Sequence, residues 1–291
     1  MTVKNVRRII NKKTVLDIPE LHISNSVVGV VGPNGSGKST LLKIISGCIE
    51  EYLGSSFVDG LNIVENHKNC VRKIGALIEN PQLYSYVNSY DMLQIAYKLR
   101  NGKNGNDVEI ENSLNQVSLS SKKDVQIQDL SSGEKKRLSI GLALVGSPDI
   151  IILDEPTNNM DSEGVSIFQR LINCLREDSN RLIIITSHEL DIIGKICDRL
   201  IFLINGQIRK DFIINKNGYF LLLETDISAN PATLGQFRTE MLTGNRVAVW
   251  IENEDELNYL FRIISEMGIK LKGIEKMTQA EFEYKKVLNQ L

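Results

Sequence analysis

The sequence has no long apolar run. A membrane-spanning helix needs about 20 consecutive apolar residues, and the apolar stretches of this chain are much shorter. These stretches are Val27–Val31, Ile150–Leu153, Leu182–Ile185, Leu200–Ile204 and Phe220–Leu223. The first residues, Met1–Lys13, are basic and lack the apolar core of a signal peptide. We therefore expect the chain to have no membrane-spanning segment of its own.

Paired cysteines and an excess of basic charge are also missing. The four cysteines are scattered, without a C-x-x-C pair, which argues against a zinc site or a disulfide framework and for reduced thiols. With 34 Lys and Arg against 36 Asp and Glu, the net charge is −2, so a nucleic-acid partner has no electrostatic support. Together these features predict a soluble cytosolic protein.

What the chain does contain is an alternation of apolar and amphipathic segments. The short apolar runs are rich in Val, Ile and Leu and predict buried strands of a parallel or mixed sheet. Between them, Ser39–Cys48, Ser162–Arg176 and Glu189–Cys197 predict helices. This order predicts an α/β domain that binds its ligand at the carboxyl ends of the strands.

Two regions differ from this pattern and suggest the domain organisation. Within an α/β domain at residues 1–210, residues from about 80 to 145 are mainly helical, with helices expected at Ser89–Leu99 and Val108–Val117. Residues 211–291 predict a small C-terminal accessory α+β region. Its expected strands are Tyr219–Thr225, Val247–Ile251 and Ile269–Ile274, and its expected helices are Leu234–Leu242, Glu254–Met267 and Ala280–Leu291.

A glycine-rich segment between the first apolar run and the first predicted helix matches the P-loop pattern G-x-x-x-x-G-K-[ST]. Its residues are Gly32, Pro33, Asn34, Gly35, Ser36, Gly37, Lys38, Ser39 and Thr40. The glycines let backbone N–H groups converge on phosphate oxygens, and the following helix adds its N-terminal dipole. Lys38 is expected to contact the β- and γ-phosphates, and the Ser39 hydroxyl to ligate Mg²⁺.

Two further strands end in polar residues. Ile150–Leu153 runs into Asp154 and Glu155, and paired carboxylates at an apolar strand end call for a cation. We expect Asp154 to hold Mg²⁺ through water and Glu155 to accept a proton from the attacking water. Leu182–Ile185 is followed closely by His188, a candidate γ-phosphate sensor. The alternatives are an acidic turn and a packing histidine.

These motifs together resemble the ATP-binding subunits of ABC transporters over about residues 1–210. The segment Leu130–Arg137 resembles the family signature L-S-G-G-Q, with Ser132 in place of Gly and Glu134 in place of Gln. Asn159–Asp161 resembles the D-loop that follows it, and His188 matches the switch histidine. The resemblance implies a P-loop NTPase fold with a helical subdomain, hydrolysis of ATP with Mg²⁺, and a nucleotide contact by Asp161.

The resemblance also implies partners. In the family, two subunits form a head-to-tail dimer, and the signature of one meets the γ-phosphate held by the other, which makes Ser131, Ser132, Gly133 and Glu134 nucleotide contacts. The spacing Ser131-x-x-Glu134 has a structural interpretation too, a helix capping box. A separate membrane-spanning permease is the other expected partner, which places the chain in the cytoplasm on the inner face of the membrane.

Two departures from the family pattern refine the hypothesis. No aromatic residue precedes the P-loop, and Ile9 or Ile10 stands near the place of the adenine-stacking residue, so we expect weak base selectivity. Glu79 stands where the Q-loop normally has Gln, unless the alignment shifts to Gln82, and Glu79 becomes a candidate Mg²⁺ ligand. The run I-G-x-L-I-E-x-P resembles ABC-2-type exporters of antimicrobial peptides, including lantibiotic-immunity and bacitracin-resistance pumps.

Three tyrosines near this loop raise a question about the permease contact. Tyr84, Tyr86 and Tyr90 either fill a groove for the membrane partner or form the core of the helical region. Two functional alternatives stay open at this point. One is an ABC ATPase that acts without a membrane partner, and the other is a nucleotide sensor that scarcely hydrolyses ATP.

Overall fold

The protein, represented by a computed structural model, folds into two compact units. The structure describes residues 1–24, 26–79, 81–177, 181–225, 234, 237–242, 246–267 and 269–288. Unit 1 comprises Met1–His188 and Ile196–Asp211, and unit 2 comprises Glu189–Lys195 and Phe212–Leu291. Among the described residues, no helix has the length and apolar character that crossing a bilayer requires.

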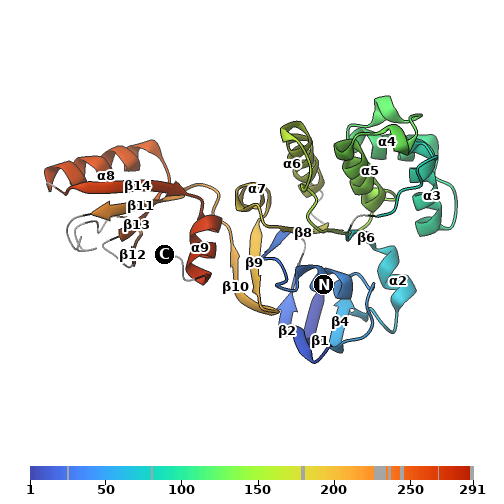
Figure 1. Ribbon diagram of the computed structural model, residues 1–291, viewed down its shortest axis with the longest axis horizontal. Helices are drawn as coiled ribbons and strands as arrows, with labels where there is room; N and C mark the ends of the chain where they lie inside the picture. The colour runs from blue at the N-terminus through green and yellow to red at the C-terminus, as the bar shows by residue number, and fades with distance from the viewer. Residues whose placement is uncertain are drawn as a thin grey trace. The chain divides into compact units, whose positions relative to one another are not determined.

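The centre of unit 1 is a six-stranded sheet in the order β10-β9-β3-β8-β7-β6 (Figure 1). Its strands are β3 (Val27–Val31), β6 (Ile74–Leu77), β7 (Ile150–Leu153), β8 (Leu182–Ser187), β9 (Arg199–Ile204) and β10 (Gln207–Ile213). The pairs β3–β8, β3–β9, β7–β8 and β6–β7 are parallel. Every residue of β3, β7 and β8 is buried, as the short apolar runs predicted.

A second, antiparallel sheet covers the helix that follows the P-loop. Its order is β2-β1-β4-β5, and its strands are β1 (Thr2–Ile10), β2 (Lys13–His22), β4 (Leu53–Val58) and β5 (Leu61–Asn62). Apolar residues of this sheet, of α1 (Lys38–Ile45) and of the six-stranded sheet share one core. These strands are not predicted by the apolar runs of the sequence. In β1, Asn5 has φ +50° and the pairing with β4 shifts there, so Val3 and Val6 are both buried and simple alternation is lost.

The helical part of unit 1 packs beside the β6 edge of the six-stranded sheet (Figure 1). It contains α3 (Ser89–Asn101), α4 (Asp107–Gln116) and α5 (Ser132–Leu144), while α2 (His67–Arg72) precedes β6 and α6 (Ser162–Arg176) follows β7. Two single-turn 3₁₀ helices, Ser120–Lys122 and Ile127–Asp129, lead into α5. Gly75 allows α5 to approach β6, because a Cβ atom at Gly75 would lie 1.8 Å from the Ala143 carbonyl oxygen.

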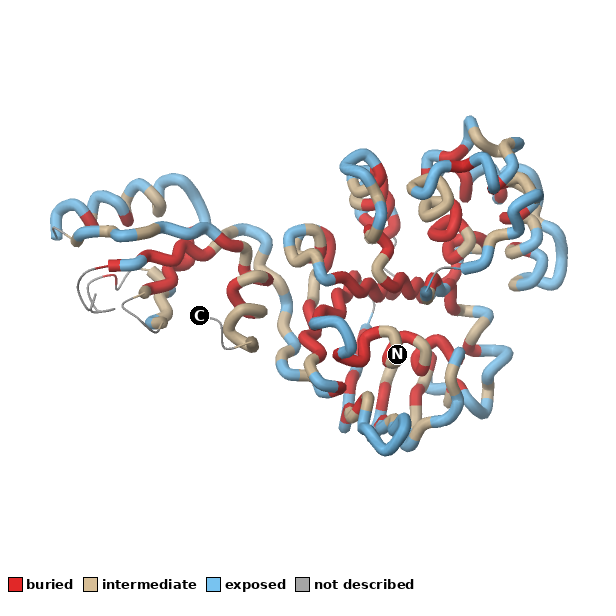
Figure 2. The backbone as a smooth tube through the Cα atoms, in the orientation of Figure 1, coloured by how far each residue is buried: buried red, intermediate tan, exposed pale blue. Residues whose placement is uncertain are grey.

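Unit 2 contains an antiparallel sheet in the order β12-β13-β11-β14, whose central strands β13 and β11 are largely buried (Figure 2). Its elements are α7 (Leu190–Ile196), β11 (Tyr219–Thr225), β12 (Thr239–Leu242), β13 (Arg246–Ile251), α8 (Glu254–Glu266), β14 (Leu271–Met277) and α9 (Gln279–Val287). Leu260 and Ile264 of α8 pack on one face of the sheet, and Phe282 of α9 packs on the other. Gly194 of α7 faces α9, with a Cβ at that position 3.4 Å from the Ala280 Cβ.

One expected element of unit 2 is wrong. The helix expected at Leu234–Leu242 is contradicted by β12, in which Thr239–Leu242 pairs antiparallel with β13. The cross-strand pairing with β13 decides the conformation of this segment. The end of the last expected helix, residues 289–291, lies outside the described residues.

Candidate functional site

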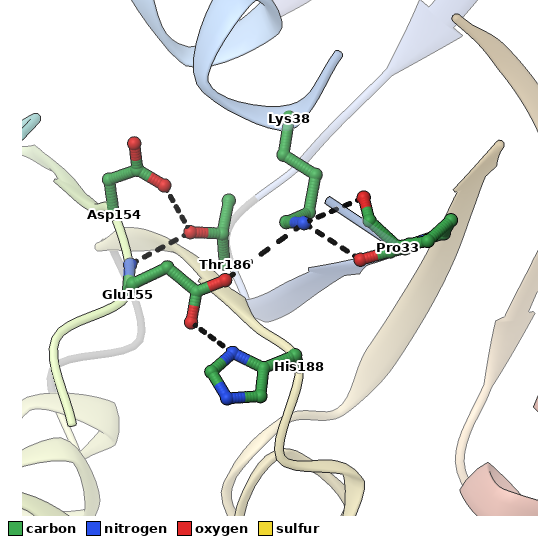
Figure 3. Close-up of polar contacts among 7 residues, drawn as sticks. Pro33, Lys38, Asp154, Glu155, Thr186 and His188 are labelled. Atoms are coloured by element: carbon green, nitrogen blue, oxygen red, sulfur yellow. Dashed lines mark hydrogen bonds and ion pairs between the residues drawn. The ribbon is translucent and has the colours of Figure 1, made fainter. Parts of the chain in front are cut away.

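The candidate site lies where three neighbouring strands of unit 1 end. Strands β3, β8 and β7 are adjacent and parallel, with Val31 opposite Ser187 and Leu153 opposite Ile185. The P-loop follows β3, Asp154 and Glu155 follow β7, and His188 follows β8. Because the carboxyl ends of parallel strands share one edge, these residues gather in one place (Figure 3).

The P-loop forms a cradle with a cavity of about 250 Å³, lined by Asn34–Thr40 together with Val15 and Glu155. Gly37 has φ +104°, a conformation that favours glycine, and starts α1. At Gly32 a Cβ atom would lie 2.0 Å from the Leu203 carbonyl oxygen. The Ser36 hydroxyl is buried and has no hydrogen-bond partner within the described part of the chain. A buried unpaired hydroxyl in a cradle of backbone N–H groups suits a phosphate oxygen.

Lys38 spans the cradle and the acidic strand end. Its ammonium group donates to the carbonyl oxygens of Gly32 at 2.7 Å and Pro33 at 3.3 Å, and lies 3.9 Å from Glu155 Oε1 (Figure 3). Burial lowers the pKa of Lys38, an effect that the Glu155 and Asp154 carboxylates oppose. The lysine charge is therefore held at the mouth of the cradle, near the proposed base.

Thr186 organises the two carboxylates. Its hydroxyl donates to Asp154 Oδ1 at 2.5 Å and accepts from the Glu155 backbone N–H at 2.9 Å. Glu155 has φ +46°, a strained conformation for this residue type, and its Oε2 lies 3.0 Å from His188 Nδ1. The sequence analysis gave Thr186 no role, although a threonine at the end of an apolar strand was a detectable signal.

A neighbouring cavity of about 300 Å³ adds four residues to this group. It is lined by Glu79, Lys136, Asp154, Glu155, Asn158 and Asn159. Glu79 has φ +61°, is 67% exposed, and its Oε1 lies 2.5 Å from the ammonium group of Lys43 in α1. Lys136 of α5 was not predicted from the sequence, because a helical lysine has no signal that separates it from a solvated one.

The signature residues lie at the start of α5 and do not line the phosphate cradle of their own subunit. Ser131 caps the helix by accepting from the Glu134 N–H at 3.2 Å, and Glu134 Oε2 accepts from the Ser131 N–H at 2.8 Å. The capping box is thus present. The hydrogen bond that the Glu134 carboxylate accepts from the Ser131 backbone N–H is the main cause that lowers the pKa of Glu134. Ser131 and Ser132 are exposed, and Gly133 is half-buried. Asp161, the D-loop candidate, is exposed and caps α6 by accepting from the Gly164 N–H at 2.8 Å.

The two isoleucines expected near an adenine base do not line the cradle cavity. Ile9 and Ile10 are 54% and 42% exposed at the end of β1, and neither lines the cradle cavity. Val15 of β2 lines it instead, because its backbone lies against Gly37 and Gly206. Sequence reasoning missed Val15, since only the pairing of β2 brings it there.

The tyrosines near the Q-loop do not form a core. Tyr84 and Tyr86 are 62% and 81% exposed, which contradicts the core alternative for both. Tyr90 is half-buried, and its hydroxyl donates to Asp107 Oδ1 at 2.5 Å. Tyr84 and Tyr86 are therefore available on the surface of unit 1.

The chain is similar to known proteins in sequence and in fold. Residues 20–158 match the model of the ABC transporter family. The chain is 31% identical to the lantibiotic transport ATP-binding protein SrtF of Streptococcus pyogenes, over 72% of this chain and 88% of that protein. It is 32% identical to the bacitracin transport ATP-binding protein BcrA of Enterococcus faecalis, over 73% of this chain and 69% of that protein. The post-hydrolysis dimer of the ATP-binding cassette MJ0796 with ADP and Pi has the same fold, with a TM-score of 0.66, 23% identity, and coverage of 73% of this chain and 98% of that one.

The chain therefore belongs to the ATP-binding proteins of the ABC transporter family. Its fold is that of a P-loop ABC ATPase, and its enzymatic class is ATPase.

Proposed function

We propose that the chain powers export of a peptide or peptide antibiotic through a separate membrane-spanning permease. The observation that carries the ATPase part is the convergence of the P-loop, Asp154, Glu155 and His188 at one sheet edge. The substrate class rests on the two transport proteins for lantibiotic and bacitracin to which the chain is similar. The exposed Tyr84 and Tyr86 support a permease contact beside the Q-loop. Such a role places the chain in the cytoplasm at the inner membrane face.

The donor set fits a magnesium ion shared with ATP. No group of three or more His, Cys, Asp or Glu able to hold a metal is found among the described residues. Mg²⁺ commonly binds through one or two protein oxygens plus substrate phosphates. The ion would be held by Ser39, at the start of α1, and by Asp154, whose carboxylate also accepts a hydrogen bond from the Thr186 hydroxyl. Glu79 would have to break its ion pair with Lys43 to join them. The ion would neutralise charge on the transferred phosphate.

In the proposed reaction, backbone N–H groups of the P-loop and Lys38 bind the phosphates, which displaces the Lys38 ammonium from the Gly32 and Pro33 carbonyls. Glu155 orients and deprotonates the attacking water, and His188 holds the Glu155 carboxylate from the other side. Since Ser131 and Ser132 are exposed and away from their own cradle, they are available to the γ-phosphate of a second subunit in a head-to-tail dimer. In the same arrangement, Gly133, Glu134 and the D-loop residue Asp161 complete the contact.

The domain assignment belongs to the same proposal. We assign residues 1–210 to the ABC ATPase domain, with its helical subdomain at about 80–145, and residues 211–291 to an accessory region. Helix α7, which starts two residues after His188, groups with the second compact unit.

The test of the ATPase assignment is Glu155→Gln. Removing the proton acceptor should lower ATP turnover at least 100-fold, while ATP binding and ATP-dependent dimerisation persist. Glu163→Gln, an exposed carboxylate in the first turn of α6, is the matched control and should keep wild-type turnover. Full turnover in Glu155→Gln, measured by phosphate release, would contradict the assignment.

The export role needs a cellular test. The chain is produced in a sensitive host together with a candidate membrane-spanning permease, and the minimum inhibitory concentrations of bacitracin and a lantibiotic are measured. Resistance to one of them that disappears with Glu155→Gln supports export. Equal sensitivity with and without an active chain would contradict the substrate class.

A further inference from the structure

Lys136 lies one turn inside α5 and lines the cavity that contains Glu79, Asp154 and Glu155. Its side chain is half-buried, and no hydrogen bond or ion pair of its ammonium group is found in the part of the chain that the structure describes. Burial lowers the pKa of Lys136, whereas the Asp154 and Glu155 carboxylates act to raise it. The ammonium group therefore interacts with both carboxylates across the cavity without being bound to either.

The other charges of this cavity are already engaged. Glu79 is paired with Lys43 at 2.5 Å, and Glu155 lies near Lys38 and His188. Asp154 accepts a hydrogen bond from the neutral hydroxyl of Thr186. Lys136 thus adds a positive charge to a cavity whose lining contributes three carboxylates. An entering triphosphate is repelled by those carboxylates, and the lysine offsets part of that repulsion.

We propose that Lys136 is a positioning residue for the nucleotide site of its own subunit, in which its charge offsets the Asp154 and Glu155 carboxylates while the triphosphate enters. This proposal rests on the ATP site described above. In this proposal α5 has two roles. The first residues of the helix face the nucleotide bound by a partner subunit, and Lys136 in its second turn acts on the nucleotide bound by its own subunit. Movement of α5 during dimer closure then alters the charge at both sites.

The experiment compares ATP affinity in Mg²⁺ and in EDTA for the full chain. The variants are Lys136→Gln and Lys136→Met, which remove the charge, and Lys136→Arg, which keeps it. Metal-free ATP carries more negative charge than Mg-ATP, so it depends more on Lys136. We expect the ratio of the dissociation constant in EDTA to that in Mg²⁺ to rise about three- to tenfold for both neutral variants and to stay within about twofold for Lys136→Arg.

Lys135→Gln is the matched control. Lys135 is the neighbouring lysine on α5, is also half-buried, and donates to the Gln128 carbonyl oxygen at 3.1 Å, but it does not line the carboxylate cavity. The ratio of the ATP dissociation constant in EDTA to that in Mg²⁺ should be the same for Lys135→Gln as for the wild type. An unchanged ratio in a folded neutral variant, or an equal change in Lys136→Arg or Lys135→Gln, would overturn the proposal. A wild-type chain that fails to bind ATP would instead overturn the nucleotide site itself.

Discussion

Replacing Thr186 by valine tests whether this hydroxyl holds the two carboxylates in place. The change keeps the shape of the side chain but removes the donor to Asp154 Oδ1 and the acceptor of the Glu155 N–H. Each buried polar group left without a partner costs about 1–3 kcal/mol. We therefore expect the free energy of unfolding to fall by about 2–4 kcal/mol.

A second buried threonine supplies the control. The Thr157 hydroxyl is buried and has no hydrogen-bond partner among the residues described, so Thr157→Val breaks no bond and should leave stability unchanged or slightly higher. Thr186→Ser keeps the hydroxyl and should recover most of the loss.

Urea unfolding followed by far-ultraviolet circular dichroism measures both changes. With a slope of about 2–3 kcal/mol per molar urea, Thr186→Val should lower the midpoint by about 0.7–2 M. ATP turnover should fall about 10- to 100-fold, because residues that orient a metal ligand have effects of that size. Equal midpoints for Thr186→Val and Thr157→Val would refute this account of the Asp154–Thr186–Glu155 contacts.

Three further outcomes are expected. Because the pKa of Glu134 is lowered, the stability that its carboxylate contributes is present above the ordinary glutamate pKa of about 4.3 and is lost as the pH falls below it. The difference in stability between the wild type and Glu134→Gln, measured by thermal unfolding, should therefore shrink from pH 7 to pH 3. Phe282→Ala removes a ring stacked 4.0 Å from Phe220 and should destabilise unit 2 by about 3–5 kcal/mol, read by fluorescence of the single tryptophan, Trp250, whereas an unchanged transition would contradict the packing. ATP and GTP should bind with similar affinity, because no aromatic residue precedes the P-loop and Ile10 lies outside the cradle cavity; strong ATP preference in competition binding would be the opposite result.

The residues that sequence reasoning found are those whose spacing is local. The P-loop and the capping box of Ser131 and Glu134 depend on contacts within a few residues, so their pattern predicts their geometry. The buried strands were found for a similar reason, since parallel strands covered on both faces give unbroken apolar runs. Helix α6 and strand β11 have the expected bounds.

What the sequence could not predict depends on pairing between distant segments. Val15 reaches the cradle because β2 and the P-loop lie side by side, and the sequence of neither segment predicts that it contacts the other. The strand Thr239–Leu242 is fixed by its partner β13, which overrides local helical spacing. Both cases concern residues whose conformation or role is decided by cross-strand neighbours.

The substituted Q-loop shows how such a distant contact bears on mechanism. A glutamate in place of the family's usual glutamine adds a negative charge beside the place expected for the γ-phosphate, which by itself opposes ATP binding. Glu79 is neutralised by Lys43 from the helix that begins at the P-loop, and the adjacent cavity contains Lys136 from the signature helix. The added carboxylate is therefore paired with a lysine of α1 and shares a cavity with a lysine of α5. In the proposed dimer, ATP binding that pulls Lys43 toward phosphate would therefore free the Glu79 carboxylate from its ion pair.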